Sequence, residues 1–326
     1  MNRNWLNWVL GAALGVGAGC GGPGPVPEAP GGGAERVRPE VSGEAALEEV
    51  RRLVGLGLRD SGTEGAERAA VHLRDRLREL GVEAEIEEFR DRTPAGERVF
   101  RNVTGRIPGE SGRVVLVGSH YDTKAGMAAG FEGANDSGSS TGLLLELARV
   151  FRAGAPHPME LRVVFFDGEE CLEAYGPEDG LHGSREAARR MEADGSLKDV
   201  AALILLDMVG DRDLTITIPR NSTPWLAALA FDAARAEGAR PRFQLYPYRI
   251  LDDHEPFLEK GVPAVNLIDF HYGSGPGRND YWHTAEDTMD KLSAESLGLV
   301  GRVAQRLAEE VMRREAAGEN GGRPGF

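Results

Sequence analysis

The feature that most constrains the fold is a set of three short apolar runs that end in acidic or imidazole side chains. The runs, residues 114–117, 161–166 and 202–206, are rich in β-branched, aromatic and other apolar residues, as buried strands are. Polar groups follow each run closely: His120 and Asp122, then Glu169 and Glu170, then Asp207. Because the carboxyl ends of parallel strands meet in one crevice, these side chains are expected to lie together.

Periodicity along the chain predicts an α/β fold. Apolar residues recur at helical spacing in six segments: 43–55, 66–80, 140–151, 184–194, 223–237 and 294–316. Strand-like segments are interspersed with them: 82–89, 99–107, 113–118, 162–166, 202–208, 214–218 and 264–268. This alternation favours a three-layer sandwich, with a central mixed, largely parallel sheet covered by helices on both faces. With 41% hydrophobic residues in 326, the chain can form one large catalytic domain over 43–316.

The adjacent carboxylates Glu169 and Glu170 indicate a metal site with a general base. Like charges raise each other's pKa, so one acid needs a cation while the other can then hold a proton near neutral pH. A solvated acidic turn would be the ordinary interpretation of such a pair. Further ligand types, Asp136 before the helix at 140–151 and His283 far downstream, argue against it. Carboxylates and imidazoles without thiolates suit zinc in an open, catalytic site.

These segments resemble the zinc-aminopeptidase superfamily that includes the glutaminyl-peptide cyclotransferases, or glutaminyl cyclases. The resemblance spans about residues 42–310. Several motifs resemble the cyclase branch more than the aminopeptidases: HYDTK at 120–124, FFDGEE at 165–170, DGLHGSR at 179–185, DDHEPF at 252–257 and WHT at 282–284.

The resemblance implies a role for each motif residue. A single zinc ion would be held by Asp136, Glu170 and His283, with Glu169 as the proton shuttle. Asp207 and Asp252 would form a hydrogen-bonded acid network beside the shuttle. Trp282 would wall the substrate pocket, and Tyr175 stands near a position where animal cyclases carry a pocket tryptophan.

Two alternatives remain open from the sequence. A two-zinc aminopeptidase would use the same parts, with His120 and Asp207 holding a second ion, Asp136 bridging and Glu169 activating water. A non-catalytic binding module on a peptidase fold is disfavoured, since it would be expected to lose Glu169 or a ligand.

The cyclase interpretation makes peptides or proteins with an amino-terminal Gln the expected partners. Their α-amine would attack their own γ-carbonyl and expel ammonia, with the metal stabilising the charge on the carbonyl oxygen. Glu169 would carry the proton between the two nitrogens. With 52 acidic against 38 basic residues and a net charge of −14, nucleic acids and anionic membrane surfaces are disfavoured as partners.

The amino terminus predicts export. Residues 1–20 combine a basic start, a mostly apolar stretch and small residues before Cys20, which resembles a lipoprotein-type signal peptide; an ordinary signal peptide is the alternative. Residues 21–42 are Gly/Pro-rich and predict a flexible tether, and 317–326 predict a disordered tail. The expected location is the cell envelope or periplasm, with membrane contact only through a lipid on Cys20. Cys171 is the only other cysteine, so no internal disulfide is expected.

Overall fold

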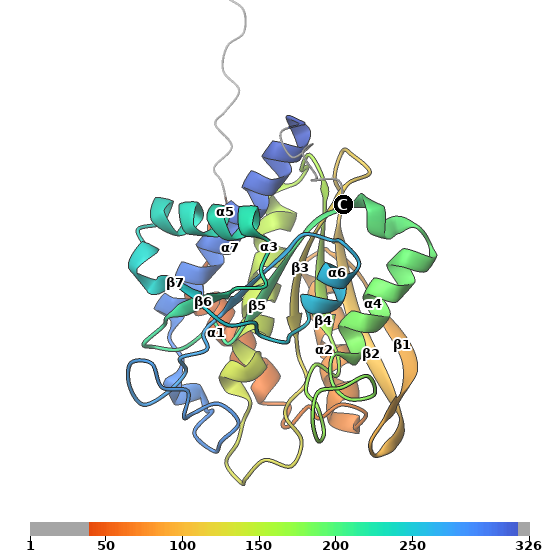
Figure 1. Ribbon diagram of the computed structural model, residues 1–326, viewed down its shortest axis with the longest axis vertical. Helices are drawn as coiled ribbons and strands as arrows, with labels where there is room; N and C mark the ends of the chain where they lie inside the picture. Colours follow the sequence, from red (N-terminus) through yellow and green to blue (C-terminus); the bar gives the residue numbers. More distant parts are fainter. Residues whose placement is uncertain (1–38, 319–326) are drawn as a thin grey trace, which may run out of the picture. The chain divides into compact units, whose positions relative to one another are not determined.

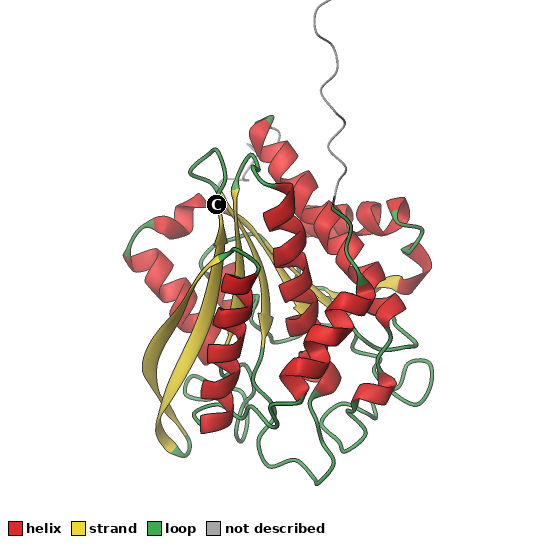
Figure 2. Cartoon of the chain, turned by 180° about the vertical axis from the view of Figure 1, so that it is seen from behind, coloured by secondary structure: helices red, strands yellow, loops and turns green. Residues whose placement is uncertain are grey.

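The computed structural model describes residues 39–318, which form an eight-stranded sheet between two layers of helices (Figures 1 and 2). The predicted signal peptide, the tether up to residue 38 and the tail from residue 319 lie outside the described residues. Within the described part, no helix has both the length and the apolar character needed to cross a bilayer.

The sheet has the strand order β1-β2-β4-β3-β5-β8-β6-β7. Its strands are β1 (Glu83–Thr93), β2 (Gly96–Ile107), β3 (Val114–His120), β4 (Glu160–Phe166), β5 (Val200–Asp207), β6 (Ile216–Pro219), β7 (Phe243–Tyr246) and β8 (Ala264–Ile268). The central strands β4, β3, β5 and β8 are mutually parallel. Antiparallel pairs flank them, β1 with β2, β2 with β4, and β6 with β8. The prediction of a mixed α/β sheet with a parallel centre is confirmed.

Helices cover both faces of this sheet. One layer contains α1 (Gly43–Val54), α2 (Glu64–Glu79), α3 (Ser140–Gly154), α5 (Pro224–Ala236) and α7 (Ala294–Ala316). The other layer contains α4 (His182–Ala193) and the single-turn α6 (Glu255–Glu259), which contact each other. Four short helical turns complete the fold: the π-helical η1 (Ala134–Ser139), and η2 (Ser196–Asp199), η3 (Arg240–Arg242) and η4 (Met289–Lys291).

Alternation along the central strands divides the apolar residues between two cores. In β3, Val115 and Val117 pack with the five-helix layer, whereas Val114 and Leu116 pack with the α4 and α6 side. Successive side chains of a strand point to opposite faces, so a run that is apolar at every position can serve both cores. The three runs noted in the sequence are therefore buried strands.

Some elements differ from their predicted extent. The strand β7 and the helix α6 were not predicted. Two of the four residues of β7 are exposed, so it is not an apolar run, and α6 is a single turn, too short to repeat at helical spacing. The strand β1 continues to Thr93, beyond the predicted end at residue 89, because it pairs with β2 through a tight hairpin. Helix α2 begins at Glu64, where Thr63 caps it by accepting a hydrogen bond from the Ala66 N–H.

Candidate metal centre

The polar residues that follow the central strands meet at one end of the sheet. β3 ends at His120 and β5 at Asp207, while Glu169 and Glu170 follow the end of β4. These strands are parallel neighbours, so their carboxyl ends lie side by side. The connecting loops gather at the lower end of the molecule in Figure 1, coloured yellow to blue. Asp136 lies in η1, which directly precedes α3.

Asp136, Glu170 and His283 form one group that could hold a metal ion. Each offers a ligand atom, and these atoms all lie within 4.8 Å of one another. The Nε2 atom of His283 lies 3.1 Å from Asp136 Oδ2 and 2.8 Å from Glu170 Oε1. Asp136 and Glu170 are buried, and His283 has a left-handed backbone with φ 55°. The fold thus brings together the three residues that the family resemblance implies as ligands.

A second group shares Asp136 with the first. It consists of His120, Asp136 and Asp207, whose ligand atoms also lie within 4.8 Å of one another. His120 Nε2 is 3.2 Å from Asp136 Oδ1 and 3.4 Å from Asp207 Oδ1. The two oxygens of Asp136 therefore face different imidazoles, which is the arrangement that a bridging carboxylate needs.

Burial and mutual repulsion raise the pKa values of several carboxyl groups in this centre. Burial raises the pKa of the Glu169 carboxyl well above its usual value, His120 opposes the rise, and Glu170 adds to it. Burial and then repulsion from Asp136 raise the pKa of Glu170 to about 7. Hydrogen bonds with Asp136 and Glu170 outweigh the effect of burial on His283 and raise its pKa to about 10. A divalent cation among these groups would offset the repulsion between the acids.

The donor set fits zinc. Oxygen and imidazole donors without a thiolate are a common zinc environment, and three protein ligands leave a position open for substrate. The carboxylate Oε2 of Glu170 is buried without a hydrogen-bond partner, as is Oδ1 of Asp207. Buried polar atoms are normally satisfied. A cation in the first group would satisfy Glu170 Oε2, and one in the second group would satisfy Asp207 Oδ1.

Two acids position the candidate ligands, mainly by accepting hydrogen bonds from backbone N–H groups. Asp122 lies with Oδ1 3.4 Å from His120 Nδ1, and its carboxylate accepts the N–H groups of Glu169 and Glu170 at 3.1 and 3.2 Å. Asp287 accepts the N–H groups of Asn135 and Asp136 at 2.7 and 3.2 Å. Asp122 stands in the motif next to His120, whereas Asp287 was missed because nothing in its local sequence distinguishes it from a surface acid.

Arg59 is a second residue that the sequence did not single out. Its side chain is fully buried, and the guanidinium donates hydrogen bonds to the carbonyls of Tyr121 at 2.9 Å and Gly133 at 2.8 Å. Tyr121 directly follows His120 at the end of β3, and Gly133 directly precedes η1, which contains Asp136. The local sequence does not mark Arg59 for this role, because it lies beside Asp60 in a loop after α1 that looks like any charged surface turn.

The remaining predicted site residues lie around Glu169 and His283. The Tyr175 hydroxyl is hydrogen-bonded to the Glu169 carboxylate, and Asp252 accepts a hydrogen bond from Asn266 Nδ2 at 2.6 Å. Asp252 also raises the pKa of Glu169 through repulsion. The Trp282 ring stacks on the His283 imidazole, with centroids 4.1 Å apart. Phe270 packs against Trp282, and Tyr246 packs against Phe270, so the aromatic row extends beyond Trp282.

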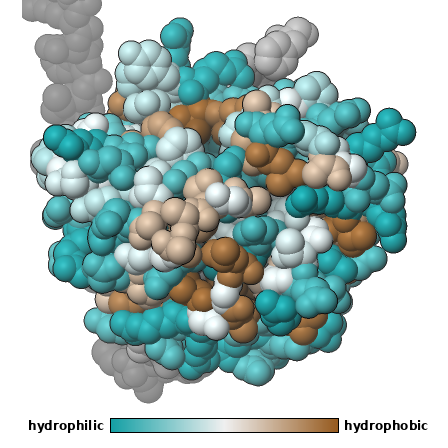
Figure 3. All heavy atoms as spheres, turned by 90° about the horizontal axis from the view of Figure 1, so that it is seen from below, coloured by the Kyte–Doolittle hydropathy of each residue, from teal (hydrophilic) through white to brown (hydrophobic). Residues whose placement is uncertain are grey.

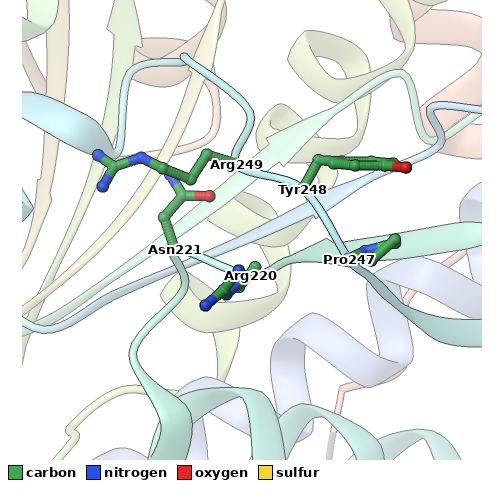
Figure 4. Close-up of a pocket in the computed structure, with 5 residues that line it drawn as sticks. All are labelled: Arg220, Asn221, Pro247, Tyr248 and Arg249. Atoms are coloured by element: carbon green, nitrogen blue, oxygen red, sulfur yellow. The ribbon is translucent and has the colours of Figure 1, made fainter.

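The surface has hydrophobic and hydrophilic residues interspersed at this end of the sheet, as Figure 3 shows. A separate concavity is lined by Arg220, Asn221, Pro247, Tyr248 and Arg249 (Figure 4). None of the predicted site residues lines it. Its Arg249 is paired with Glu255, and its Asn221 lies 2.7 Å from His254 Nε2, so it is supported from behind by α6 and the turn before it.

Fold and site together define a class, the α/β proteins with a cluster of carboxylates and imidazoles, suited to bind a metal, at the carboxyl ends of a mixed sheet. Comparison with known proteins narrows this class. Residues 102–308 match the model of peptidase family M28. The chain belongs to this family.

Individual relatives indicate an activity more specifically than the family model does. A curated glutaminyl-peptide cyclotransferase-like protein from Bos taurus is 32% identical over 78% of this chain and 72% of its own length. The crystal structure of a glutaminyl cyclase from an Acidobacteriales bacterium has a TM-score of 0.81 and is 35% identical, over 86% of this chain and 98% of that one. A Zn-dependent exopeptidase from Parabacteroides distasonis has a TM-score of 0.75 at 25% identity, over 85% of this chain and all of that one.

Proposed function

We propose that the protein is a zinc-dependent glutaminyl-peptide cyclotransferase, which converts an amino-terminal Gln into pyroglutamate and releases ammonia. The observation that carries the proposal is a buried carboxylate, Glu169, next to the three-residue metal group of Asp136, Glu170 and His283. The similarity to curated and crystallised glutaminyl cyclases supports this activity over others of the family.

Asp136, Glu170 and His283 would hold the zinc ion. When bound, zinc would polarise the γ-carbonyl of the substrate and stabilise the negative charge that develops on its oxygen.

Glu169 would move the proton. The substrate's α-amine nitrogen forms a bond to Cδ, the carbonyl carbon of the side-chain amide, which closes a five-membered ring. The carbon–nitrogen bond of that amide breaks, and ammonia leaves. The proton lost by the attacking amine passes to the Glu169 carboxylate and from there to the leaving nitrogen, so no water is consumed. The raised pKa of Glu169 suits a group that must both accept and return a proton near neutral pH.

The surrounding residues would orient the substrate and exclude water. Because the reaction is intramolecular, the pocket mainly has to fold the Gln side chain back on its own amine. Trp282 would form one wall, since its ring covers the face of His283. Asp207 and Asp252 would form the buried acid network next to Glu169, where both carboxyls have pKa values that burial raises.

Incubation with a Gln-initiated peptide should yield one ammonia per peptide and a product lighter by one ammonia. Mass spectrometry and an ammonia assay measure both quantities. The same peptide with Asn at its amino terminus is the matched control and should react far more slowly, because its shorter side chain would have to close a strained four-membered ring. Release of a free amino acid in place of ammonia would contradict the proposal.

A two-metal aminopeptidase is the second candidate. It is favoured by the His120, Asp136 and Asp207 group, which shares Asp136 with the first. In that reaction Glu169 would activate water for attack on the first peptide bond. Hydrolysis of an aminoacyl-anilide and two zinc ions per chain would support this candidate, whereas one zinc ion and ammonia release support the cyclotransferase.

We also propose that the protein is exported and anchored in the cell envelope by a lipid on Cys20. This part rests on the sequence of residues 1–20 alone. The wild-type chain expressed in bacteria should incorporate labelled palmitate and sediment with membranes, and Cys20→Ala should abolish both. Equal labelling of the two chains would contradict the anchor.

A further inference from the structure

The hydroxyl of Tyr175 is hydrogen-bonded to both carboxylate oxygens of Glu169, at 3.0 Å from Oε1 and 3.1 Å from Oε2. Within residues 39–318, no other side chain is hydrogen-bonded to this carboxylate. Glu169 is itself buried, so water gives it little alternative support. The orientation of the Glu169 carboxylate therefore depends on one hydroxyl.

The loop between the two residues is built to keep that hydroxyl in place. The Asp179 carboxylate accepts three successive backbone N–H groups, from Leu172 at 2.6 Å, Glu173 at 2.8 Å and Ala174 at 3.0 Å. The base of the loop is closed on Glu169, whose carbonyl accepts the N–H of Leu181 at 3.0 Å. One loop thus carries both partners of the hydrogen bond and fixes the backbone on both sides of Tyr175.

The ring of Tyr175 packs closely against Gly180. A Cβ atom at position 180 would lie 2.4 Å from the ring atom Cδ1, well inside van der Waals contact. Gly180 also has φ +78°, a backbone conformation that other residues rarely adopt. The ring can lie this close to the backbone only because position 180 has no side chain, so its location is defined independently of the hydrogen bond.

We infer that Tyr175 is a positioning residue, whose hydroxyl holds the Glu169 carboxylate in the orientation required for proton transfer. The inference rests on the proposed function, in which Glu169 carries the proton. A hydroxyl can donate to an ionised carboxylate without adding charge to the centre, and it limits rotation of the carboxyl group about its last bond. A correctly held base transfers a proton at a higher rate, whereas substrate affinity depends on the walls of the pocket.

Tyr175→Phe tests the hydroxyl alone, because it keeps the ring on Gly180. We expect kcat for a Gln-initiated peptide to fall about 10- to 100-fold, as for loss of one hydrogen bond to a charged group. KM should change less than about twofold and zinc content should not change, since the ring and the ligands remain. Tyr248→Phe is the matched control and should keep wild-type kinetics, because Tyr248 is 66% exposed. A fall of less than twofold in kcat, or a change mainly in KM, would reduce Tyr175 to a pocket wall.

A double-mutant cycle tests whether Tyr175 acts through Glu169 or whether its replacement lowers activity by an unrelated structural effect. Glu169→Asp keeps a carboxylate but withdraws it from the hydroxyl by one methylene, so Tyr175→Phe in this background should change kcat less than about twofold. If the two losses multiply instead, the residues act independently and the inference fails.

A failure of the inference about Tyr175 can be told apart from a failure of the proposed cyclotransferase activity. If the wild type hydrolyses aminoacyl-anilides and releases no ammonia, the cyclotransferase proposal is wrong. Glu169 is then the base that activates water, and the same variants assayed on hydrolysis test Tyr175. A kcat loss with unchanged KM would uphold the inference there, and an unchanged kcat would overturn it.

Discussion

Replacing Glu169 by Gln should lower kcat about 10²- to 10⁴-fold while zinc remains bound. Gln has nearly the same shape as Glu and can keep the hydrogen bond from Tyr175, but it cannot accept and return a proton at neutral pH. Glu169 belongs to neither metal group, so the ligand atoms are untouched. Steady-state kinetics with a Gln-initiated peptide and zinc analysis of the same sample measure the two effects.

The matched control for this variant is Glu173→Gln, an exposed carboxylate on the same loop. It should retain wild-type kinetics, because its side chain lies away from the buried centre. Thermal unfolding of Glu169→Gln should show no loss of stability, since burial disfavours the ionised form of Glu169. Turnover of the Gln variant at the wild-type rate would remove Glu169 from the mechanism, and loss of its zinc would mean that it serves as a ligand.

His283→Ala should weaken zinc binding more than about 100-fold. Outer-shell partners of a metal ligand already contribute about 10- to 100-fold, and His283 would be one of only three direct ligands. Its Nε2 atom is the only nitrogen in the group with Asp136 and Glu170. Zinc per chain after dialysis against a chelator of known affinity measures the change, and activity should fall with the zinc content.

His120→Ala is the paired variant that separates one metal from two. In the cyclotransferase proposal His120 holds no tightly bound ion, so this variant should keep about one zinc per chain. In the aminopeptidase alternative, wild type should contain two ions and His120→Ala should lose one of them. Full zinc retention by His283→Ala would refute the ligand assignment under either proposal.

Much of the fold could be predicted because its signals are local. The runs in β3, β4 and β5 are apolar at nearly every position, and strands of that composition must be covered on both faces. Parallel strands then bring their carboxyl ends together without further information. The short elements β7 and α6 have no such pattern, and tertiary packing decides them.

The candidate ligands could be chosen from the sequence for a related reason. Glu170 and Asp136 stand beside clear strand and helix signals, so their place at the end of the sheet follows from those elements. His283 lies in a loop without regular structure, and its motif resemblance alone suggested it as a ligand. The structure brings its Nε2 atom within 3.1 Å of Asp136 and 2.8 Å of Glu170.

By itself, the sequence determined the layers of this protein and placed His120, Glu169, Glu170 and Asp207 at the end of its sheet, because side-chain periodicity and composition act over a few residues. Only the tertiary structure decided what supports those groups. Arg59, Asp287 and Tyr175 act on carbonyls, N–H groups and a carboxylate that the folded loops bring to them. A single charged or hydroxyl-bearing residue is not part of a repeating pattern. Its hydrogen-bond partner is therefore decided by which distant segments the fold brings next to it.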